Sequence, residues 1–299
     1  MVAYTHRIMF TLAGVLATMG VAGAQELDQP EYPTTVFAEG ARSASVQVDD
    51  VKATVQLRRG AQPGPDDSVW LMVNVGLRGV AEASAPDAGF DEPAAEASIA
   101  EMDPGNSHPE VYFTAYSGGA HCCSTVIVAE EVGNGRWVTV PVGDFDGGGN
   151  YLQDIDEDGL AEIVTVDNRF LYAFDCYACS AAPLVIRTVR NGAAVDVSSE
   201  SRYLQAHRDW LAEIESYVDP SEQWKSPGYL AGWVAAKARV GEGPAAMKAL
   251  REHWDFKRDE GEEACLTGQQ LDQCPRDKIK VMKFPDRLQL FLEQAGYAI

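Results

Sequence analysis

Apolar and polar residues alternate along much of the first two thirds of the chain. In SASVQVDDVKATVQL, residues 43–57, apolar residues recur at every second position on both sides of a polar pair. This period is typical of half-buried strands, and the polar pair predicts a β-hairpin. Residues 81–108 are rich in Ala, Pro, Asp, Glu and Ser and predict a long loop, after which short strand-like runs continue over residues 110–197. We therefore predict an antiparallel, β-rich region over residues 25–200.

Two segments of this region form a weak internal repeat. Glu110 aligns with Glu162 and Cys123 aligns with Cys179, and each cysteine precedes a strand-like run, an Asn-Gly turn or its equivalent, and another strand-like run. If the repeat is real, each unit is a small antiparallel sheet like a propeller blade. Two such units cannot close a propeller.

The pattern changes after residue 200, where apolar residues recur at helical spacing. Ser226 before Pro227 is typical of a helix start, and Gly296 is typical of a helix end. We therefore predict an α-helical unit over residues 201–299, and the fold class α+β for the whole chain. The four segments with helical spacing are residues 202–218, 226–240, 243–255 and 284–297.

The first residues have the three-part pattern of a secretory signal peptide. Arg7 precedes an apolar run over residues 8–22, and Ala22-Gly23-Ala24 forms a small-x-small cleavage site. An uncleaved membrane anchor is the alternative, although the run is short for a span. We expect residues 1–24 to be removed, no later membrane span, and a periplasmic or secreted protein.

The charge balance narrows the class of partner. The chain has 24 Lys and Arg residues against 45 Asp and Glu residues, which gives a formal net charge of −21. Such a chain repels phosphate backbones, so we expect no nucleic-acid binding. The acidity favours solubility and cation binding rather than any particular partner. We expect a protein or glycan partner whose identity the sequence does not indicate. It does not set the oligomeric state.

One acidic loop, DIDEDGLAE, has the spacing of a cation site. Alternate residues of a tight loop converge on one centre, and hard oxygen ligands suit calcium better than magnesium or soft metals. The loop is not an EF-hand, because Thr165 stands at position 12, where that loop needs glutamate. A solvated acidic turn is the alternative. The predicted ligands are Asp154, Asp156, Asp158, the carbonyl of Leu160, and Glu162.

An acid at position 9 followed by a strand-like run resembles the calcium loops of FG-GAP or VCBS-type repeats. The resemblance implies a blade-like antiparallel region with calcium held by the five residues just named. The Phe-Gly-Gly-Ala-Pro signature of those repeats is absent. Two nearby segments look like worn copies of the acidic loop, in which the pattern of acids is incomplete. We expect no tight calcium binding at either of them. One offers Asp144 and Asp146, and the other keeps Asp103, Asn106 and Glu110.

The six cysteines of an exported protein predict disulfides. Cys265 and Cys274 bracket a short polar loop, and we expect them to pair. In SGGAHCCS, a vicinal pair follows His121, and three interpretations are open. Cys122 and Cys123 bond to Cys176 and Cys179; or His121 and the C-x-x-C thiolates bind a metal; or His121 activates a cysteine nucleophile.

The SGGAHCC segment, the DxDxDG loop and the AGWVAA helix together resemble exported bacterial proteins of unknown function. That resemblance implies location and architecture only. We therefore expect an exported, calcium-binding, disulfide-stabilised protein that acts as a binding or structural envelope component. The alternative is a periplasmic or secreted hydrolase, although the chain has no G-x-S-x-G, H-E-x-x-H or Walker motif. A deep polar pocket that holds His121 or another titratable group with a perturbed pKa would favour the hydrolase, and an exposed apolar patch on the helical unit would favour the binder.

Overall fold

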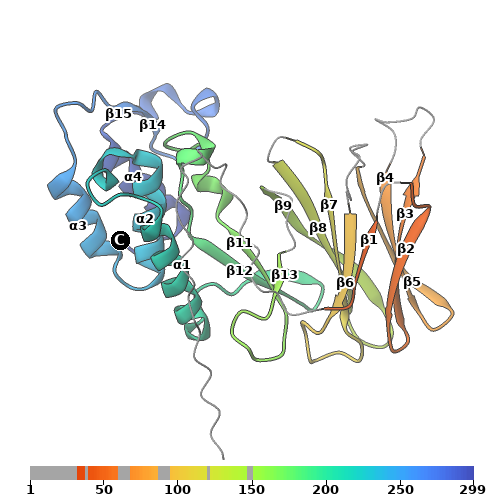
Figure 1. Ribbon diagram of the computed structural model, residues 1–299. Helices are drawn as coiled ribbons and strands as arrows, with labels where there is room; N and C mark the ends of the chain where they lie inside the picture. The colour runs from red at the N-terminus through yellow and green to blue at the C-terminus, as the bar shows by residue number, and fades with distance from the viewer. Residues whose placement is uncertain (1–31, 38–39, 60–67, 87–94, 120–121, 147–150) are drawn as a thin grey trace, which may run out of the picture.

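The computed structural model describes residues 32–37, 40–59, 68–86, 95–119, 122–146 and 151–299. The expected signal peptide, residues 1–24, lies outside these ranges. The fold is α+β, as the sequence predicts: antiparallel sheets occupy the first two thirds, and the α-helices follow them. Figure 1 shows the helices at one end, a sandwich of two sheets at the other, and a small sheet between them. No helix in the described part of the chain is long and apolar enough to cross a membrane.

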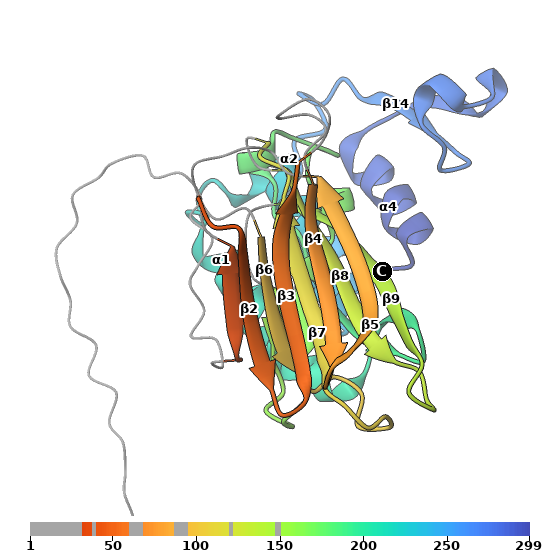
Figure 2. The same ribbon diagram turned by 90° about the vertical axis from the view of Figure 1, so that its right-hand side faces the viewer.

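The sandwich consists of a four-stranded and a five-stranded antiparallel sheet. Burial alternates with a period of two along β3 (Val51–Arg58), so its valines point inward and meet side chains of the five-stranded sheet in one core. Figure 2 shows the strands of the two sheets running side by side. The first sheet has the order β2 (Ser43–Val48), β3 (Val51–Arg58), β4 (Ser68–Val75) and β5 (Arg78–Pro86). The second has the order β1 (Thr34–Phe37), β6 (Ala95–Ala100), β7 (Glu110–Tyr116), β8 (Cys122–Glu131) and β9 (Trp137–Asp146).

The small sheet covers the outer face of the five-stranded sheet, which is therefore buried on both sides. Along β7, Val111 and Phe113 enter the core of the sandwich, whereas Tyr112 packs with Ile163 and Val189 of the small sheet. This double burial explains why VYFTAY reads as a continuous apolar run rather than an alternating one. The small sheet has the order β10 (Leu152–Gln153), β11 (Glu162–Val166), β12 (Leu184–Arg190) and β13 (Ala193–Asp196).

Four α-helices and a short β-hairpin form the C-terminal unit. The side chain of Ser226 accepts a hydrogen bond from the Tyr229 N–H as the predicted N-cap of α2, and Gly296 ends α4 in the left-handed region with φ 83°. All four predicted helices are thereby confirmed. The elements are α1 (Leu204–Ser216), α2 (Pro227–Arg239), α3 (Gly243–His253), β14 (Glu262–Cys265), β15 (Ile279–Met282) and α4 (Phe284–Ala295).

The core of the helical unit includes residues from the preceding segment. Phe170 and Ala182 are buried in the same cluster as Leu230 and Leu288. The hydroxyl of Tyr297, near the C-terminus, donates to Asp167 at 2.9 Å. The division of the chain at residue 200 stays a prediction, with these contacts crossing it.

The prediction of a long loop over residues 81–108 is wrong. Most of β5 and all of β6 lie in this range, and β6 is a central strand between β1 and β7. Its side chains are mainly Ala and Ser, which pack closely between two layers but give a weak hydrophobic signal. The two segments of the internal repeat each contain an antiparallel meander, β7–β8–β9 and β11–β12–β13. Their membership in propeller blades stays a prediction.

Candidate metal centre

The acidic loop connects two paired strands of the small sheet. Leu152 of β10 pairs with Ile163 of β11, and Gln153 pairs with Glu162, so the chain leaves and re-enters the sheet at one point. Within the loop, Glu157 and Gly159 have left-handed backbones with φ 59° and 88°. These two residues fold the loop back on itself.

Hydrogen bonds within the loop fix its shape. The two carboxylate oxygens of Asp154 accept from the N–H groups of Asp158 at 3.0 Å and Gly159 at 2.9 Å. Oδ1 of Asp158 accepts from the N–H of Leu160 at 2.9 Å. Alternating aspartates are compatible with this turn, because their short side chains reach backbone N–H groups a few residues ahead.

Three of the predicted ligands converge. Asp154, Asp156 and Glu162 each offer one carboxylate oxygen, and these oxygens lie within 4.8 Å of one another. The Asp156 side chain is only 10% exposed, and its buried Oδ1 has no hydrogen-bond partner among the described residues. Leaving a buried acceptor unsatisfied costs about 1–3 kcal/mol, and more when it is charged. A cation between the three carboxylates would satisfy this oxygen, so the residues fit a hard metal ion.

Burial raises the pKa of two of these acids. The pKa of Glu162 rises to about 7, mainly through burial, and the hydrogen bond from Tyr203 and the N–H of Ile155 oppose the rise. Burial is the main cause that raises the pKa of Asp156 above its usual value, and the charge of Asp158 adds to it. The charge of Arg202 lowers this pKa in part. A bound cation would favour the ionised form of both acids.

Asp158 faces a guanidinium instead of the other three acids. Its Oδ2 accepts from Nη1 of Arg202 at 2.7 Å, and the same nitrogen lies 3.3 Å from Oδ2 of Asp156. Nε of Arg202 donates to Glu200 at 3.0 Å. The guanidinium therefore supplies a positive charge at the rim of the acidic loop. The ligand roles of Asp158 and of the Leu160 carbonyl stay predictions.

Three further residues at this centre were not predicted from the sequence. Arg202 and Tyr203 precede α1, about forty positions after the loop, and the Tyr203 hydroxyl donates to Oε1 of Glu162 at 2.9 Å. Tyr32 lies close enough for the charges of Asp154 and Glu162 to add to the effect of burial, which raises its pKa to about 12. Pairing over such distances in the chain has no local pattern by which it could be found.

In the two worn copies, the carboxylates of Glu110 and Asp144 accept hydrogen bonds from other groups. Glu110 accepts from the N–H groups of Met102 at 2.7 Å and Asp103 at 3.1 Å, and from the side chain of Asn106. Asp144 lies on β9, where its carboxylate accepts from the hydroxyl of Thr125 at 2.7 Å. Asp146 ends the same strand. The absence of tight calcium binding at these segments stays a prediction.

The cysteine predictions are partly confirmed. Cys265 and Cys274 form the expected disulfide, with Cα atoms 5.9 Å apart. The predicted bonds from Cys122 and Cys123 to Cys176 and Cys179 are wrong, because Cys176 and Cys179 bond to each other with Cα atoms 5.0 Å apart. The prediction assigned bonds by sequence grouping, whereas a turn brings the two C-x-x-C sulfurs directly together.

The remaining cysteine interpretations involve His121. The disulfide between Cys176 and Cys179 removes the two thiolates that the metal interpretation needs, so that interpretation is wrong. Cys123 is also disulfide-bonded and is not a free nucleophile. His121 and the side chain of Cys122 lie outside the described residues. The periplasmic or secreted hydrolase, whose site no recognisable motif encodes, therefore stays a prediction.

Comparison with known proteins places the chain in a family. The family described as the sll0997 C-terminal domain matches residues 207–296. The probable thylakoid lumen protein sll0997 of Synechocystis sp. is 34% identical over 258 residues, which cover 85% of this chain and 76% of that protein. The uncharacterized protein y4bJ of Sinorhizobium fredii is 33% identical over 205 residues, 68% of this chain and 32% of that protein. No solved structure matches the chain. At this identity and coverage, the chain belongs to the sll0997 family.

Proposed function

We propose that this protein is exported and binds calcium in the loop Asp154–Glu162, where the ion stabilises a binding or structural component of its compartment. The observation that supports calcium most directly is the buried Oδ1 of Asp156, which lies in a group of three carboxylates and has no hydrogen-bond partner in the part of the chain that the structure describes. Net negative charge packed this closely is tolerated when a cation neutralises it. Arg202 neutralises part of it, from one side.

The chemistry of the donors favours calcium. Asp154, Asp156 and Glu162 offer hard oxygen atoms, and the Leu160 carbonyl is the expected backbone ligand. Calcium accepts six to eight oxygens in irregular geometry, whereas magnesium needs a near-octahedral shell and keeps several waters. Asp158 would become a ligand of the ion when its carboxylate breaks the contact with Arg202. This exchange makes the guanidinium a competitor of the ion for one carboxylate.

The position of the loop suggests a structural role for the ion. Glu162 begins β11, and its carboxylate accepts from Tyr203, directly before α1. Tyr203 is fully buried with Ile186 and Val197 of the small sheet region. A cation held by Glu162 would therefore stabilise the point at which the helical unit meets the small sheet. Neutralising the loop would support both parts together.

Export rests on separate observations. The signal-peptide pattern of residues 1–24 agrees with the description of the relative sll0997 as a probable thylakoid lumen protein. The disulfides are compatible with an oxidising compartment. For this chain, a periplasmic or secreted location and cleavage after Ala24 follow as proposals. Mass spectrometry of the protein from its native compartment tests them, since an uncleaved N-terminus would contradict both.

Thermal unfolding in calcium and in chelator tests the proposed ion. A ligand that binds only the folded state stabilises it by RT ln(1 + [L]/Kd), about 2.7 kcal/mol at a hundredfold excess over Kd. We expect a higher melting temperature in calcium for the parent protein. Asp156→Asn should lose this shift, whereas Asp144→Asn, in a worn copy of the loop, should keep it.

Circular dichroism distinguishes a variant that has lost the ion from one that has lost the fold. Far-ultraviolet circular dichroism in chelator should give the same spectrum for both variants and the parent, because the Asp156 substitution removes charge from an already crowded loop. A parent protein with equal melting temperatures in calcium and in chelator would contradict the proposal. An equal calcium shift in Asp156→Asn would contradict the assigned site.

A further inference from the structure

The two fully described disulfides differ in exposure and in the length of chain that they close. Cys176 and Cys179 are both exposed and lie three positions apart. Cys265 and Cys274 are both buried, 7% and 9% exposed, and lie nine positions apart. Thiol–disulfide exchange requires a thiolate to reach a sulfur, so exposure favours reaction at the first pair.

The Cys176–Cys179 bond is not needed to close its turn. The N–H of Cys179 donates to the carbonyl of Cys176 at 3.0 Å, and the Ser180 hydroxyl donates to the same oxygen at 2.9 Å. The N–H of Ser180 donates to the Tyr177 carbonyl at 3.1 Å. The entropy that a disulfide removes from the unfolded chain decreases as the closed loop shortens. The short loop and these hydrogen bonds leave the bond a small part in stability.

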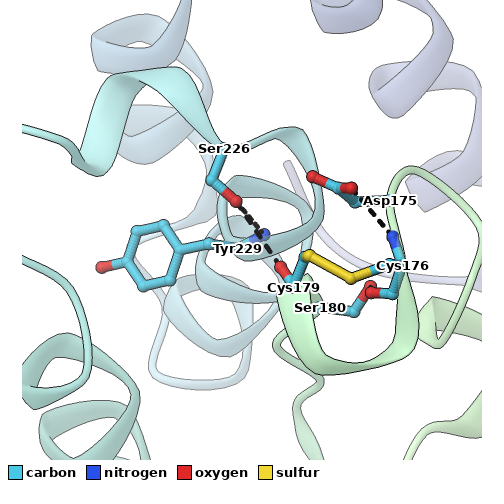
Figure 3. The surroundings of a disulfide bond; sticks show 6 residues. All are labelled: Asp175, Cys176, Cys179, Ser180, Ser226 and Tyr229. Carbon is cyan, nitrogen blue, oxygen red and sulfur yellow. Dashed lines mark hydrogen bonds between the residues drawn. A yellow bond between two sulfur atoms is a disulfide. The ribbon is translucent and has the colours of Figure 1, made fainter. Parts of the chain in front are cut away.

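The Cys176–Cys179 turn packs against the N-terminal part of α2, as Figure 3 shows. Ser226, the N-cap of α2, has its hydroxyl 3.5 Å from the Cys179 carbonyl, and the N–H of Ala181 donates to the Gly228 carbonyl at 3.3 Å. A Cβ on Gly228 would lie 2.7 Å from the Cys179 oxygen, so glycine permits this close approach.

Asp175 places a carboxylate beside the Cys176–Cys179 disulfide. One of its carboxylate oxygens and the two sulfurs lie within 4.8 Å of one another. Its Oδ1 accepts from the N–H of Cys176 at 2.8 Å, which holds the carboxylate at the turn (Figure 3). A carboxylate charge at this distance disfavours a thiolate, so the sulfurs take up protons when the bond is reduced.

The surface around the turn also offers an aromatic contact. Tyr172 is 55% exposed and has a left-handed backbone with φ 67°, a conformation that a bulky residue rarely adopts. Its ring centroid lies 5.7 Å from that of Tyr177, which sits between the two cysteines in sequence. Exposed tyrosines are common at contact surfaces, and strained backbone is concentrated at functional sites.

We propose that Cys176–Cys179 is a redox-active disulfide that a dithiol donor reduces while the protein remains folded. A thiolate of the donor attacks one sulfur, which breaks the Cys176–Cys179 bond and forms a mixed disulfide. The second thiolate of the donor then attacks the mixed disulfide and releases the protein. Two electrons pass to the protein, the two cysteines take up two protons, and the donor leaves as a disulfide.

Selective reduction under native conditions tests this proposal. The purified protein is equilibrated with graded dithiothreitol, its free thiols are alkylated, and its peptides are mapped by mass spectrometry. We expect Cys176 and Cys179 to be alkylated at concentrations at least about tenfold lower than those needed for Cys265 and Cys274. Reduction of both pairs together, or of Cys176–Cys179 only after denaturant has unfolded the chain, would overturn the proposal.

Cysteine variants separate a redox role from a structural one. Cys179→Ser leaves Cys176 as a single thiol, which should form a mixed disulfide with oxidised glutathione in the folded protein. Cys274→Ser leaves the buried Cys265 thiol, which should react much more slowly. The double variant Cys176→Ser/Cys179→Ser should fold with a melting temperature close to that of the parent. Failure of the double variant to fold would assign the bond a structural role and overturn the proposal.

Discussion

The guanidinium of Arg202 lies 2.7 Å from Oδ2 of Asp158 and thereby joins the acidic loop to the segment that leads into α1. The same nitrogen lies 3.3 Å from Oδ2 of Asp156, whereas no described residue donates a hydrogen bond to Oδ1 of Asp156. One face of the acidic loop is therefore neutralised by an internal cation. The other face, where Asp154, Asp156 and Glu162 converge, is the proposed calcium site.

Arg202→Gln should strengthen calcium binding. The substitution removes a positive charge beside the site and frees Asp158 to act as a ligand. Because the Arg202 side chain is 30% exposed, solvent weakens its effect, and we expect an increase of at most about tenfold in affinity. Titration calorimetry measures it, with Arg208→Gln, an exposed arginine of α1, as the control. An unchanged affinity in Arg202→Gln would show that the guanidinium does not compete with the ion.

Tyr203→Phe should destabilise the protein by about 1–3 kcal/mol, because it leaves the buried Oε1 of Glu162 without its donor at 2.9 Å. The same loss should weaken calcium binding by about tenfold, since the hydroxyl orients a proposed ligand. Urea denaturation in chelator gives the first value, and calorimetry gives the second. Tyr217→Phe removes a similar hydroxyl–carboxylate contact at an exposed site and should have little effect. Equal effects of the two substitutions would argue against a special role for Tyr203.

Gly232→Ala should destabilise the protein by about 2–3 kcal/mol, although alanine normally favours a helix over glycine. A Cβ at Gly232 of α2 would lie 2.1 Å from the carbonyl oxygen of Ala181, and backbone cannot move aside easily. Gly79→Ala serves as the control, because its Cβ would meet only the Asn74 side chain, at 3.8 Å. Urea denaturation of both variants measures the difference. A gain in stability for Gly232→Ala would mean that the segment over α2 can shift freely.

Glu110 should make stability depend on pH at a site remote from the acidic loop. Glu110 is the first residue of β7, and its carboxyl is buried. Burial raises the pKa of this carboxyl from 4.5 to about 7, and the charge of Glu101 adds to the rise. The hydrogen bonds that the carboxyl accepts lower the pKa in part. Since the folded pKa is the higher one, the folded state keeps a proton that the unfolded state releases. The contribution of Glu110 to stability is therefore complete below about pH 4.5 and is lost as the pH rises to about 7.

The variant Glu110→Gln cannot titrate and should not lose this contribution. Over the same pH range, the parent should lose up to about 3 kcal/mol relative to this variant. Urea denaturation at a series of pH values measures the two curves. Glu263→Gln, at an exposed position of β14, should give a curve parallel to that of the parent. Parallel curves for Glu110→Gln and the parent would mean that folding does not raise the pKa of Glu110.

Local patterns predicted much of this molecule. The period of two located β2 and β3, the helical spacing located α1 to α4, and the spacing of the acids located the loop in which three carboxylates converge. The failures depend on contacts between distant residues or on weak local signals. Arg202 and Tyr203 reach the loop from about forty positions away, β6 is built from small side chains, and the Cys176–Cys179 turn competes with pairings that sequence grouping favours.

Calcium titration of the chelator-stripped protein by isothermal calorimetry tests the central claim most directly. We predict saturable binding of a single calcium ion per chain, weaker binding of magnesium, no binding in Asp156→Asn, and retained binding in Asp144→Asn. The absence of saturable heat at millimolar calcium, or equal binding by the parent and Asp156→Asn, would contradict the account. In either case the convergence of Asp154, Asp156 and Glu162 would be a feature of an acidic turn rather than of a metal site.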